Sequence, residues 1–247
     1  MPLVEKVNPY SDSRRKSEQV EAMFDSIAPA YDFMNRAMTF GLDRVWLRRL
    51  LAAVTKARPL DVVDLATGTG DVAFSLCHCM PGARVTGIDL SEGMLAKARE
   101  RLLSEADTVR QRLSFRRGDS LDTGLGDGSC DAITVAYGVR NFADIAAGYR
   151  EMYRILRPGG MLAVLELSRP VNVLVKPFYS LYTRCVIPLV GRMVSGDSRA
   201  YTYLPESIAA APQGEDMTAL MREAGFSDVR FSILAPGVCT LYTASKH

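Results

Sequence analysis

Asp64-Leu65-Ala66-Thr67-Gly68-Thr69-Gly70-Asp71 is the stretch of sequence that decides the fold. Its first two residues complete a short strand predicted over Asp61–Leu65, and a helix is predicted to follow over Val72–Cys79. Its two glycines, with an alanine three residues after the second, have the spacing G-x-G-x-x-G/A. Glycines at this spacing allow a tight strand-to-helix turn and the close approach of a ligand to the backbone.

Outward from this stretch, short β-rich runs alternate with helical runs. Strands are predicted over Asp61–Leu65, Arg84–Leu90, Leu113–Arg117, Ala132–Tyr137, Met161–Leu167, Val229–Leu234 and Val238–Ala244. Helices are predicted over Val20–Ile27, Tyr31–Met38, Asp43–Lys56, Val72–Cys79, a segment capped by Ser91, Ala143–Leu156 and Gly214–Ala224. This alternation predicts an α/β fold with a doubly wound, mostly parallel, seven-stranded sheet. The hairpin-like turn Ala235-Pro236-Gly237 makes the last strand antiparallel, and Pro158-Gly159-Gly160 predicts a turn before the fifth strand.

The segments around the sheet predict one domain over residues 1–247 with added helices. Residues 1 to about 13 are expected to form a polar, poorly ordered arm. Residues 1–57 as a whole are expected to form a helical lid, and residues 58–169 a cofactor-binding sheet. Residues 170–212 interrupt the alternation with a helical insert, and residues 213–247 complete the sheet.

Charge and hydropathy exclude several classes of protein. The chain has 30 basic and 28 acidic residues, so no basic face for a nucleic-acid partner is expected. The N-terminus lacks the apolar stretch of a signal peptide, and charged residues and prolines interrupt the most apolar late stretch, Leu174–Val194. We therefore expect a cytoplasmic protein that contacts a membrane, if at all, peripherally at its inner surface. The sequence leaves open whether the chain forms a homodimer.

Five cysteines are present: Cys77, Cys79, Cys130, Cys185 and Cys239. Their odd number and irregular spacing predict reduced thiols rather than a disulfide framework. Cys77-His78-Cys79 resembles a metal-binding pattern, but residues two apart on a helix point to nearly opposite sides. No metal site is expected.

The acidic residues of the glycine stretch indicate which ligand it binds. A pyrophosphate at this helix N-terminus would face Asp71 directly and Asp64 nearby, and their charges would oppose its binding. S-adenosylmethionine (SAM) has no phosphate and carries one net positive charge on its ammonium, carboxylate and sulfonium groups. The stretch therefore favours SAM over a dinucleotide, with Thr67, Gly68, Thr69 and Gly70 beside the ligand.

Two further strands also end in aspartates. Asp89 ends the second predicted strand, where a carboxylate can accept hydrogen bonds from both ribose hydroxyls. Asp119 follows the third strand beside Ser120 and is positioned for the adenine amino group, while Leu90 and Met94 supply apolar contact. The two alternatives are turn glycines with helix-capping aspartates, and a nicotinamide enzyme. Three successive strand ends that each carry an aspartate argue against the first.

The glycine stretch resembles the first motif of class I methyltransferases, whose fold is Rossmann-like. Four more segments resemble the menaquinone/ubiquinone biosynthesis C-methyltransferase family: Val20 to Trp46, Tyr137 to Phe142, Tyr153 to Pro170 and Ser195 to Pro212. The resemblance implies cofactor contacts for Thr69, Asp89, Asp119 and Ser120. This chain departs from the family where Asp119-Ser120 replaces Asn-Ala and Ala136 replaces serine.

The family resemblance implies SAM-dependent methylation of a ring carbon in a prenylated quinol, with demethylmenaquinol as the favoured acceptor. A ubiquinone precursor, another lipidic acceptor and a non-catalytic assembly protein remain alternatives. The predicted catalytic residues are Arg140, Tyr31 and Asn141, because they can hold the quinol oxygens as negative charge develops. His78 and His247 are poorly placed to act as a base.

The isoprenoid tail of such an acceptor needs an apolar groove. The predicted groove residues are Phe24, Phe33, Met34, Met38 and Phe40 in the N-terminal helices and Phe178, Tyr179, Leu181, Tyr182, Val186, Ile187 and Leu189 in the insert. Arg184 and Arg192 are expected beside the groove, where they can touch anionic lipid headgroups. The strand-four loop lacks the Asn/Asp-Pro-Pro-Tyr/Phe motif of enzymes that methylate base nitrogens.

Overall fold

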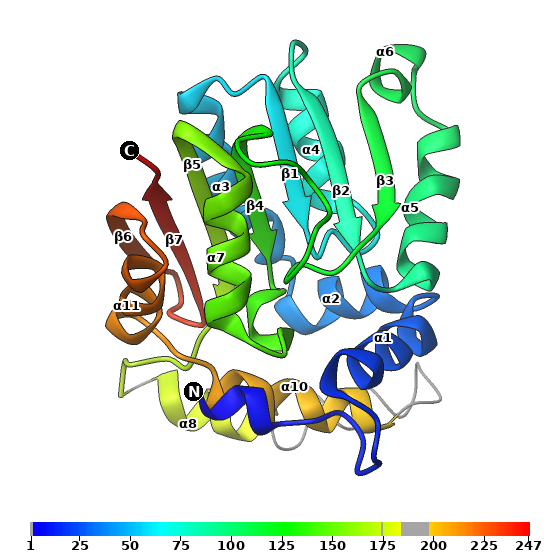
Figure 1. Cartoon of the computed structure of the whole chain (residues 1–247). Helices are drawn as coiled ribbons and strands as arrows, with labels where there is room; N and C mark the ends of the chain where they lie inside the picture. The colour runs from blue at the N-terminus through cyan, green and yellow to red at the C-terminus, as the bar shows by residue number, and fades with distance from the viewer. Residues whose placement is uncertain (1, 174, 184–197) are drawn as a thin grey trace.

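Seven strands form one sheet at the centre of the computed structural model, which describes residues 2–173, 175–183 and 198–247 (Figure 1). The strands are β1 (Asp61–Leu65), β2 (Arg84–Asp89), β3 (Leu113–Arg117), β4 (Cys130–Ala136), β5 (Leu156–Leu167), β6 (Ser227–Leu234) and β7 (Cys239–Ser245). Their order across the sheet is β3-β2-β1-β4-β5-β7-β6. Strand β7 runs antiparallel to both of its neighbours, and the pairs from β3 to β5 are parallel. The predicted mostly parallel sheet with an antiparallel last strand is confirmed.

Helices cover both faces of the sheet. They are η1 (Leu3–Lys6), α1 (Lys16–Ile27), α2 (Tyr31–Thr39), α3 (Asp43–Ala57), α4 (Asp71–Cys79), α5 (Glu92–Leu103), α6 (Asp107–Arg110), η2 (Val139–Asn141), α7 (Ile145–Ile155), α8 (Val175–Leu181), α10 (Ser198–Ala210) and α11 (Glu215–Glu223), where η marks a 3-10 helix. Helices α3 and α4 pack on one face, and α7 and α11 pack on the other. Val62 and Val63, neighbours on β1, belong to these two opposite cores, as the alternation of side chains along a strand requires.

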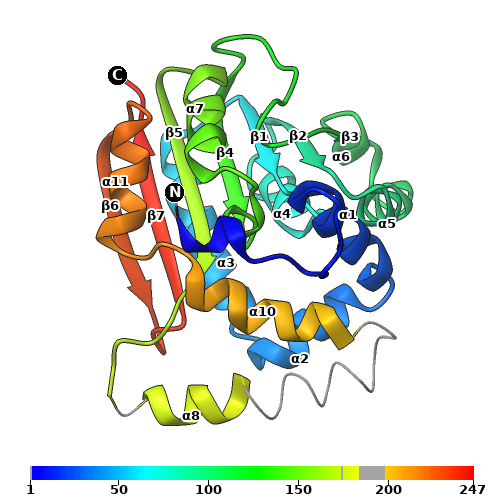
Figure 2. The same ribbon diagram turned by 60° about the horizontal axis from the view of Figure 1, so that its bottom comes forward.

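Four helices lie across the edge where the parallel strands end: α1, α2, α8 and α10 (Figures 1 and 2). Helix α1 is held there by Asp25, whose carboxylate accepts hydrogen bonds from Ser91 Oγ at 2.5 Å and from the Gly93 amide at 2.9 Å. Helix α3 is joined to the other end of the chain, because Trp46 Nε1 donates to the Ala235 carbonyl at 2.9 Å. Helices that are far apart in the sequence therefore meet over one edge of the sheet.

The first residues of the chain are packed, and the prediction of a poorly ordered arm is wrong. Val4 is fully buried in the core beside α7. The Glu5 carboxylate accepts a hydrogen bond from the Ile145 amide at 2.9 Å, and Lys16 Nζ donates to the Val4 carbonyl at 2.5 Å. Burial of Lys16 lowers its pKa to about 8. A single buried valine in a polar segment has no periodicity, which is why the sequence pattern did not reveal this contact.

Strand β5 begins earlier than predicted, and the predicted turn at Pro158-Gly159-Gly160 is wrong because these residues lie within the strand. The pairing of β5 with β4 shifts register between Cys130 and Ala132, and the Gly159 amide donates to the Lys246 carbonyl at 2.6 Å. Pairing with the end of the chain thus extends this segment. Helix α6, with four residues, was not predicted because it is too short to show a period.

The helical insert expected over residues 170–212 contains α8 and α10. Several predictions in it lie outside the described residues: the thiol of Cys185, the groove residues Val186, Ile187 and Leu189, and the basic residues Arg184 and Arg192. Within the part of the chain that the structure describes, no helix is long and apolar enough to cross a membrane.

The burial of Val4 predicts that Val4→Ala lowers the free energy of unfolding by about 2 kcal/mol, because it leaves a cavity in the core. Urea denaturation measures this change. Leu3→Ala is the matched control, since Leu3 is 71% exposed and its truncation should cost less than about 0.5 kcal/mol. Equal effects of the two substitutions would contradict the packed N-terminus.

Candidate functional site

A cavity of about 520 Å³ lies between the carboxyl ends of β1 and β4 and the helices that cross them. Its floor is formed by the glycine loop after β1 and by the segment after β4. Its other walls come from α1, α2, α3, α8 and α10 and are mostly apolar. A cavity of this size, apolar with a few polar groups, is typical of a small-molecule site.

The two glycines of the loop differ in what surrounds them. Both have positive φ angles, +56° at Gly68 and +89° at Gly70. A Cβ at Gly70 would lie 2.8 Å from the ring of Phe115, so packing alone excludes a side chain there. A Cβ at Gly68 would meet only Tyr31 Cε1, at 3.9 Å. Gly68 therefore presents open backbone to the cavity.

Two aspartates lie beneath this loop, and burial raises the pKa of both. Burial raises the pKa of Asp64 to about 7, although the hydroxyls of Thr134 and Thr67 donate to its two oxygens, each at 2.6 Å. Burial also raises the pKa of Asp89, whose carboxylate accepts from the Gly68 amide at 2.7 Å and the Ser91 amide at 2.9 Å. The negative charge of Asp89 adds to the shift at Asp64. Removing this repulsion requires protonation or a cationic ligand.

Two polar side chains of the loop already have protein partners. The Thr69 hydroxyl donates to the Asp32 carboxylate on α2 at 2.6 Å. Asp71 forms an ion pair with Arg101, whose guanidinium lies 4.2 Å from the centre of the Phe74 ring. The expectation that Asp71 opposes a phosphate with a free charge is therefore wrong, because Arg101 compensates it.

The residues predicted for the adenine side lie outside the lining of the cavity: Leu90, Met94, Asp119 and Ser120. Met94 is buried among residues of α1 and α2. Asp119 Oδ1 accepts from the Leu121 amide at 2.9 Å. The Gly118 amide donates to the Asp89 carbonyl at 3.0 Å, which keeps Asp119 next to Asp89. Asp64, Thr67, Gly68, Thr69 and Ala136, in contrast, line the cavity.

The three predicted catalytic residues line the cavity together: Tyr31, Arg140 and Asn141. Burial raises the pKa of Tyr31, and a hydrogen bond from Asn35 partly offsets this. Arg140 is buried and forms an ion pair with Glu166 at 2.8 Å; its backbone amide donates to the same carboxylate at 3.1 Å. This ion pair is not a surface salt bridge, because both side chains are less than a tenth exposed.

Four residues of the cavity have buried polar atoms without a hydrogen-bond partner in the described residues. These atoms are Tyr137 Oη, Arg140 Nε, Asn141 Oδ1 and Tyr203 Oη. Unpartnered buried polar atoms are costly, and several in one cavity indicate a polar ligand. No pattern in the sequence distinguishes Tyr203, although it lies in the quoted segment Ser195 to Pro212.

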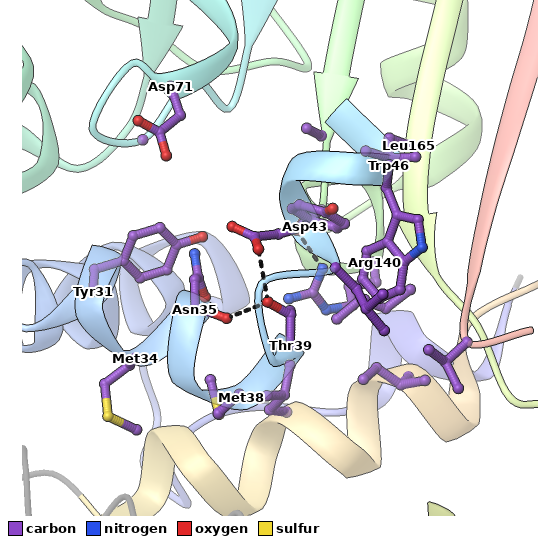
Figure 3. Close-up of a pocket in the computed structure, with 18 of the residues that line it drawn as sticks. Tyr31, Met34, Asn35, Met38, Thr39, Asp43, Trp46, Asp71, Arg140 and Leu165 are labelled. Atoms are coloured by element: carbon purple, nitrogen blue, oxygen red, sulfur yellow. Dashed lines mark hydrogen bonds between the residues drawn. The ribbon is translucent and has the colours of Figure 1, made fainter. Parts of the chain in front are cut away.

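Helix α2 presents a second polar group to the cavity. Tyr31, Asn35 and Thr39 are spaced four residues apart, and Asp43 follows four residues later in the first turn of α3. Figure 3 shows these side chains in a row from Tyr31 on the left, with Arg140 on the right beyond Thr39 and Asp43. We call Tyr31, Asn35, Thr39 and Asp43 the polar stripe.

Comparisons with known proteins agree with this architecture. The ubiE/COQ5 methyltransferase family matches residues 12–246. A demethylmenaquinone methyltransferase from Bacteroides fragilis is 46% identical over 98% of this chain and 98% of its own, and one from Porphyromonas gingivalis is 45% identical over the whole of both chains.

Among solved structures, a SAM-dependent methyltransferase from Thermotoga maritima covers 92% of this chain and 100% of its own, with a TM-score of 0.62 and 20% identity. This similarity confirms the predicted class I methyltransferase fold. Because the family match spans nearly the whole sequence, the chain belongs to the ubiE/COQ5 methyltransferase family.

Proposed function

We propose that this protein transfers a methyl group from SAM to a ring carbon of a prenylated quinol, converting demethylmenaquinol to menaquinol. The observation that carries the proposal is one apolar cavity that joins the glycine loop to the unpartnered polar atoms of Arg140, Asn141 and Tyr203. The names of the relatives from B. fragilis and P. gingivalis support this acceptor. A ubiquinone precursor has similar quinol oxygens and is the alternative acceptor.

The residues present fit SAM on two observations. Gly68 leaves its backbone open to the cavity, so a ligand can approach the loop closely. Asp64 and Asp89 repel each other beneath the loop, and a ligand with a net positive charge relieves that repulsion. Asp89 would hold the ribose hydroxyls, and Asp119 and Ser120 lie on the side where adenine is expected.

When bound, SAM supplies a methyl group on a sulfonium sulfur, which a carbon nucleophile can attack. Tyr31 lies over Gly68 and would exclude water from the loop. Arg140 Nε would donate to one quinol oxygen, and Asn141 Oδ1 would accept from the other hydroxyl. The charge of Arg140 then stabilises the negative charge that the quinol oxygen gains as its ring carbon becomes nucleophilic.

The prenyl tail would leave the cavity between α2 and α8. Phe40 and Phe178 line the cavity and are also 78% and 75% exposed, so the cavity reaches the surface beside them. Phe33, Val173 and Leu181 are exposed on the same two segments. Helices α2 and α8 lie on one side of the molecule in Figure 2. This apolar rim favours peripheral contact with a membrane, from which a lipidic acceptor would enter.

Incubation of the protein with SAM and chemically reduced demethylmenaquinone under argon should add one methyl group to the ring. Mass spectrometry of the extracted quinone measures the addition. Activity on the ubiquinone precursor alone would select the alternative acceptor. Absence of methyl transfer to either quinol would contradict the proposed function.

Arg140→Ala should lower the free energy of unfolding by about 3–5 kcal/mol, because it leaves the buried Glu166 carboxylate without its partner. Because the variant would be partly unfolded, a drop in its activity would not by itself show a catalytic role for Arg140. The double variant Arg140→Ala/Glu166→Gln removes both charges and should recover much of the stability. If it still lacks turnover, the loss lies in quinol binding or chemistry. A stable double variant with wild-type turnover would exclude the role of Arg140.

SAM should bind more tightly at pH 8 than at pH 6. With a pKa of about 7, Asp64 is largely protonated at pH 6 in the free protein, and a cationic ligand favours its ionised form. Binding must then release a proton, which weakens affinity by up to about tenfold per pH unit below the pKa. Calorimetry on the wild type and Asp64→Asn measures this. The variant should lose most of the pH dependence, and identical profiles would contradict the coupling.

A further inference from the structure

Four aspartates line the cavity within the described residues: Asp32, Asp43, Asp64 and Asp71. Asp71 is neutralised by Arg101, and Asp64 is only 1% exposed and held by two threonine hydroxyls. Asp32 is engaged by Thr69 of the glycine loop. Asp43 differs from all three, because its hydrogen bond comes from Thr39, outside the loop. It is a carboxylate available to an acceptor molecule.

The position of Asp43 suits the methyl acceptor rather than the glycine loop. It is the first residue of α3, a 15-residue helix whose first turn lines the cavity. Figure 3 shows its carboxylate in the cavity, bonded to Thr39 and on the same side of Arg140 as Tyr31. Burial first, and then the thiol of Cys239 and the charge of Asp43, raise the pKa of the Tyr137 hydroxyl, so Asp43 lies within electrostatic reach of the segment after β4.

The hydrogen bonds of Thr39 allow both protonation states of Asp43. Thr39 Oγ1 lies 2.8 Å from the Asn35 carbonyl and 2.9 Å from Asp43 Oδ1, but its hydroxyl has only one hydrogen. When Asp43 is ionised, that hydrogen can point to the carboxylate. When Asp43 is protonated, the hydrogen can turn to the Asn35 carbonyl, and Thr39 can accept from Asp43. A group that gains and loses a proton during each turnover needs such a partner.

We propose that Asp43 is the general base of the reaction, taking the proton from the quinol hydroxyl next to the carbon that is methylated. Thr39 is its positioning residue. The inference rests on the proposed function, since it presupposes a quinol in the cavity. It assigns a base to a cavity whose described lining contains neither of the chain's two histidines.

The step balances in atoms and electrons. The O–H bond breaks, its proton moves to Asp43, and its electron pair raises the electron density of the ortho carbon. That carbon forms a bond to the methyl group, and the C–S bond breaks with its electron pair left on sulfur. The ring carbon then loses its hydrogen as a proton to water, the oxygen regains the proton from Asp43, and aromaticity returns. One proton is released, which matches the loss of the sulfonium charge.

Asp43→Asn keeps an acceptor oxygen for Thr39 and removes the basicity. Turnover should fall by about 100- to 1,000-fold. Affinity for S-adenosylhomocysteine, measured by calorimetry, should stay within about threefold, because the variant leaves the glycine loop intact. Asp107→Asn is the matched control: it removes another first-turn acid, on α6, outside the cavity lining, and should keep wild-type turnover.

Two readouts separate a base from a structural role. The acidic limb of the kcat/KM pH profile should disappear in Asp43→Asn. The ratio of wild-type to variant turnover should also be smaller on a quinol with an electron-withdrawing ring substituent. The hydroxyl of such a quinol is more acidic and loses its proton more readily without a base. For the positioning residue, Thr39→Val should shift the acidic limb, and Thr39→Ser should restore it.

Failure of the wild type to methylate either quinol would overturn the proposed function. If the wild type is active, full turnover of Asp43→Asn would overturn only the role of Asp43. The same conclusion would follow if Asp43→Asn kept the wild-type pH profile and the ratio of wild-type to variant turnover were the same on both quinols. Equal profiles for Thr39→Val and Thr39→Ser would overturn the role of Thr39.

Discussion

The hydrogen bond from the Thr69 hydroxyl to the Asp32 carboxylate links the glycine loop to helix α2. A glycine loop at the end of a parallel strand is exposed to solvent and by itself encloses no cavity. With α2 fixed above it, the loop forms one wall of a cavity. Helix α2 forms another wall and carries most of the polar stripe. Helix α1 is attached in the same manner through Asp25. A few short hydrogen bonds from aspartates therefore decide whether this protein has an enclosed site.

The electrostatics of the cavity follow from its burial. On the loop side, burial raises the pKa of Asp64 and Asp89, and the charge of Asp89 adds to the shift at Asp64. On the acceptor side, Arg140 keeps its charge because Glu166 is paired with it, although burial alone would lower the pKa of the guanidinium. The acceptor side thus holds a guanidinium together with its carboxylate partner, whereas carboxylates lie beneath the loop. This arrangement suits a reaction that brings a cationic methyl donor to a carbon made electron-rich by an adjacent oxygen.

The sequence predicted the sheet well, because alternating strands and helices leave a strong periodic signal. It also identified the family and the loop from Asp64 to Asp71. It misjudged Asp71, since the compensating Arg101 comes from a helix 30 residues later. Glu166 and Tyr203 were missed for the same reason: their environments are made by segments that meet only in the folded chain. The four-residue spacing of the polar stripe was visible in the sequence, but its partners were not.

The bond between Trp46 and the Ala235 carbonyl joins residues that are 189 positions apart, and the bond between Glu5 and the Ile145 amide spans 140. Both connect walls of the cavity, or the helices behind them, to distant parts of the chain. Contacts of such long sequence separation form slowly, because a large loop of chain must close before they stabilise the fold. During synthesis, the sheet edge near the glycine loop can therefore form while the acceptor cavity stays incomplete until the final hairpin leaves the ribosome.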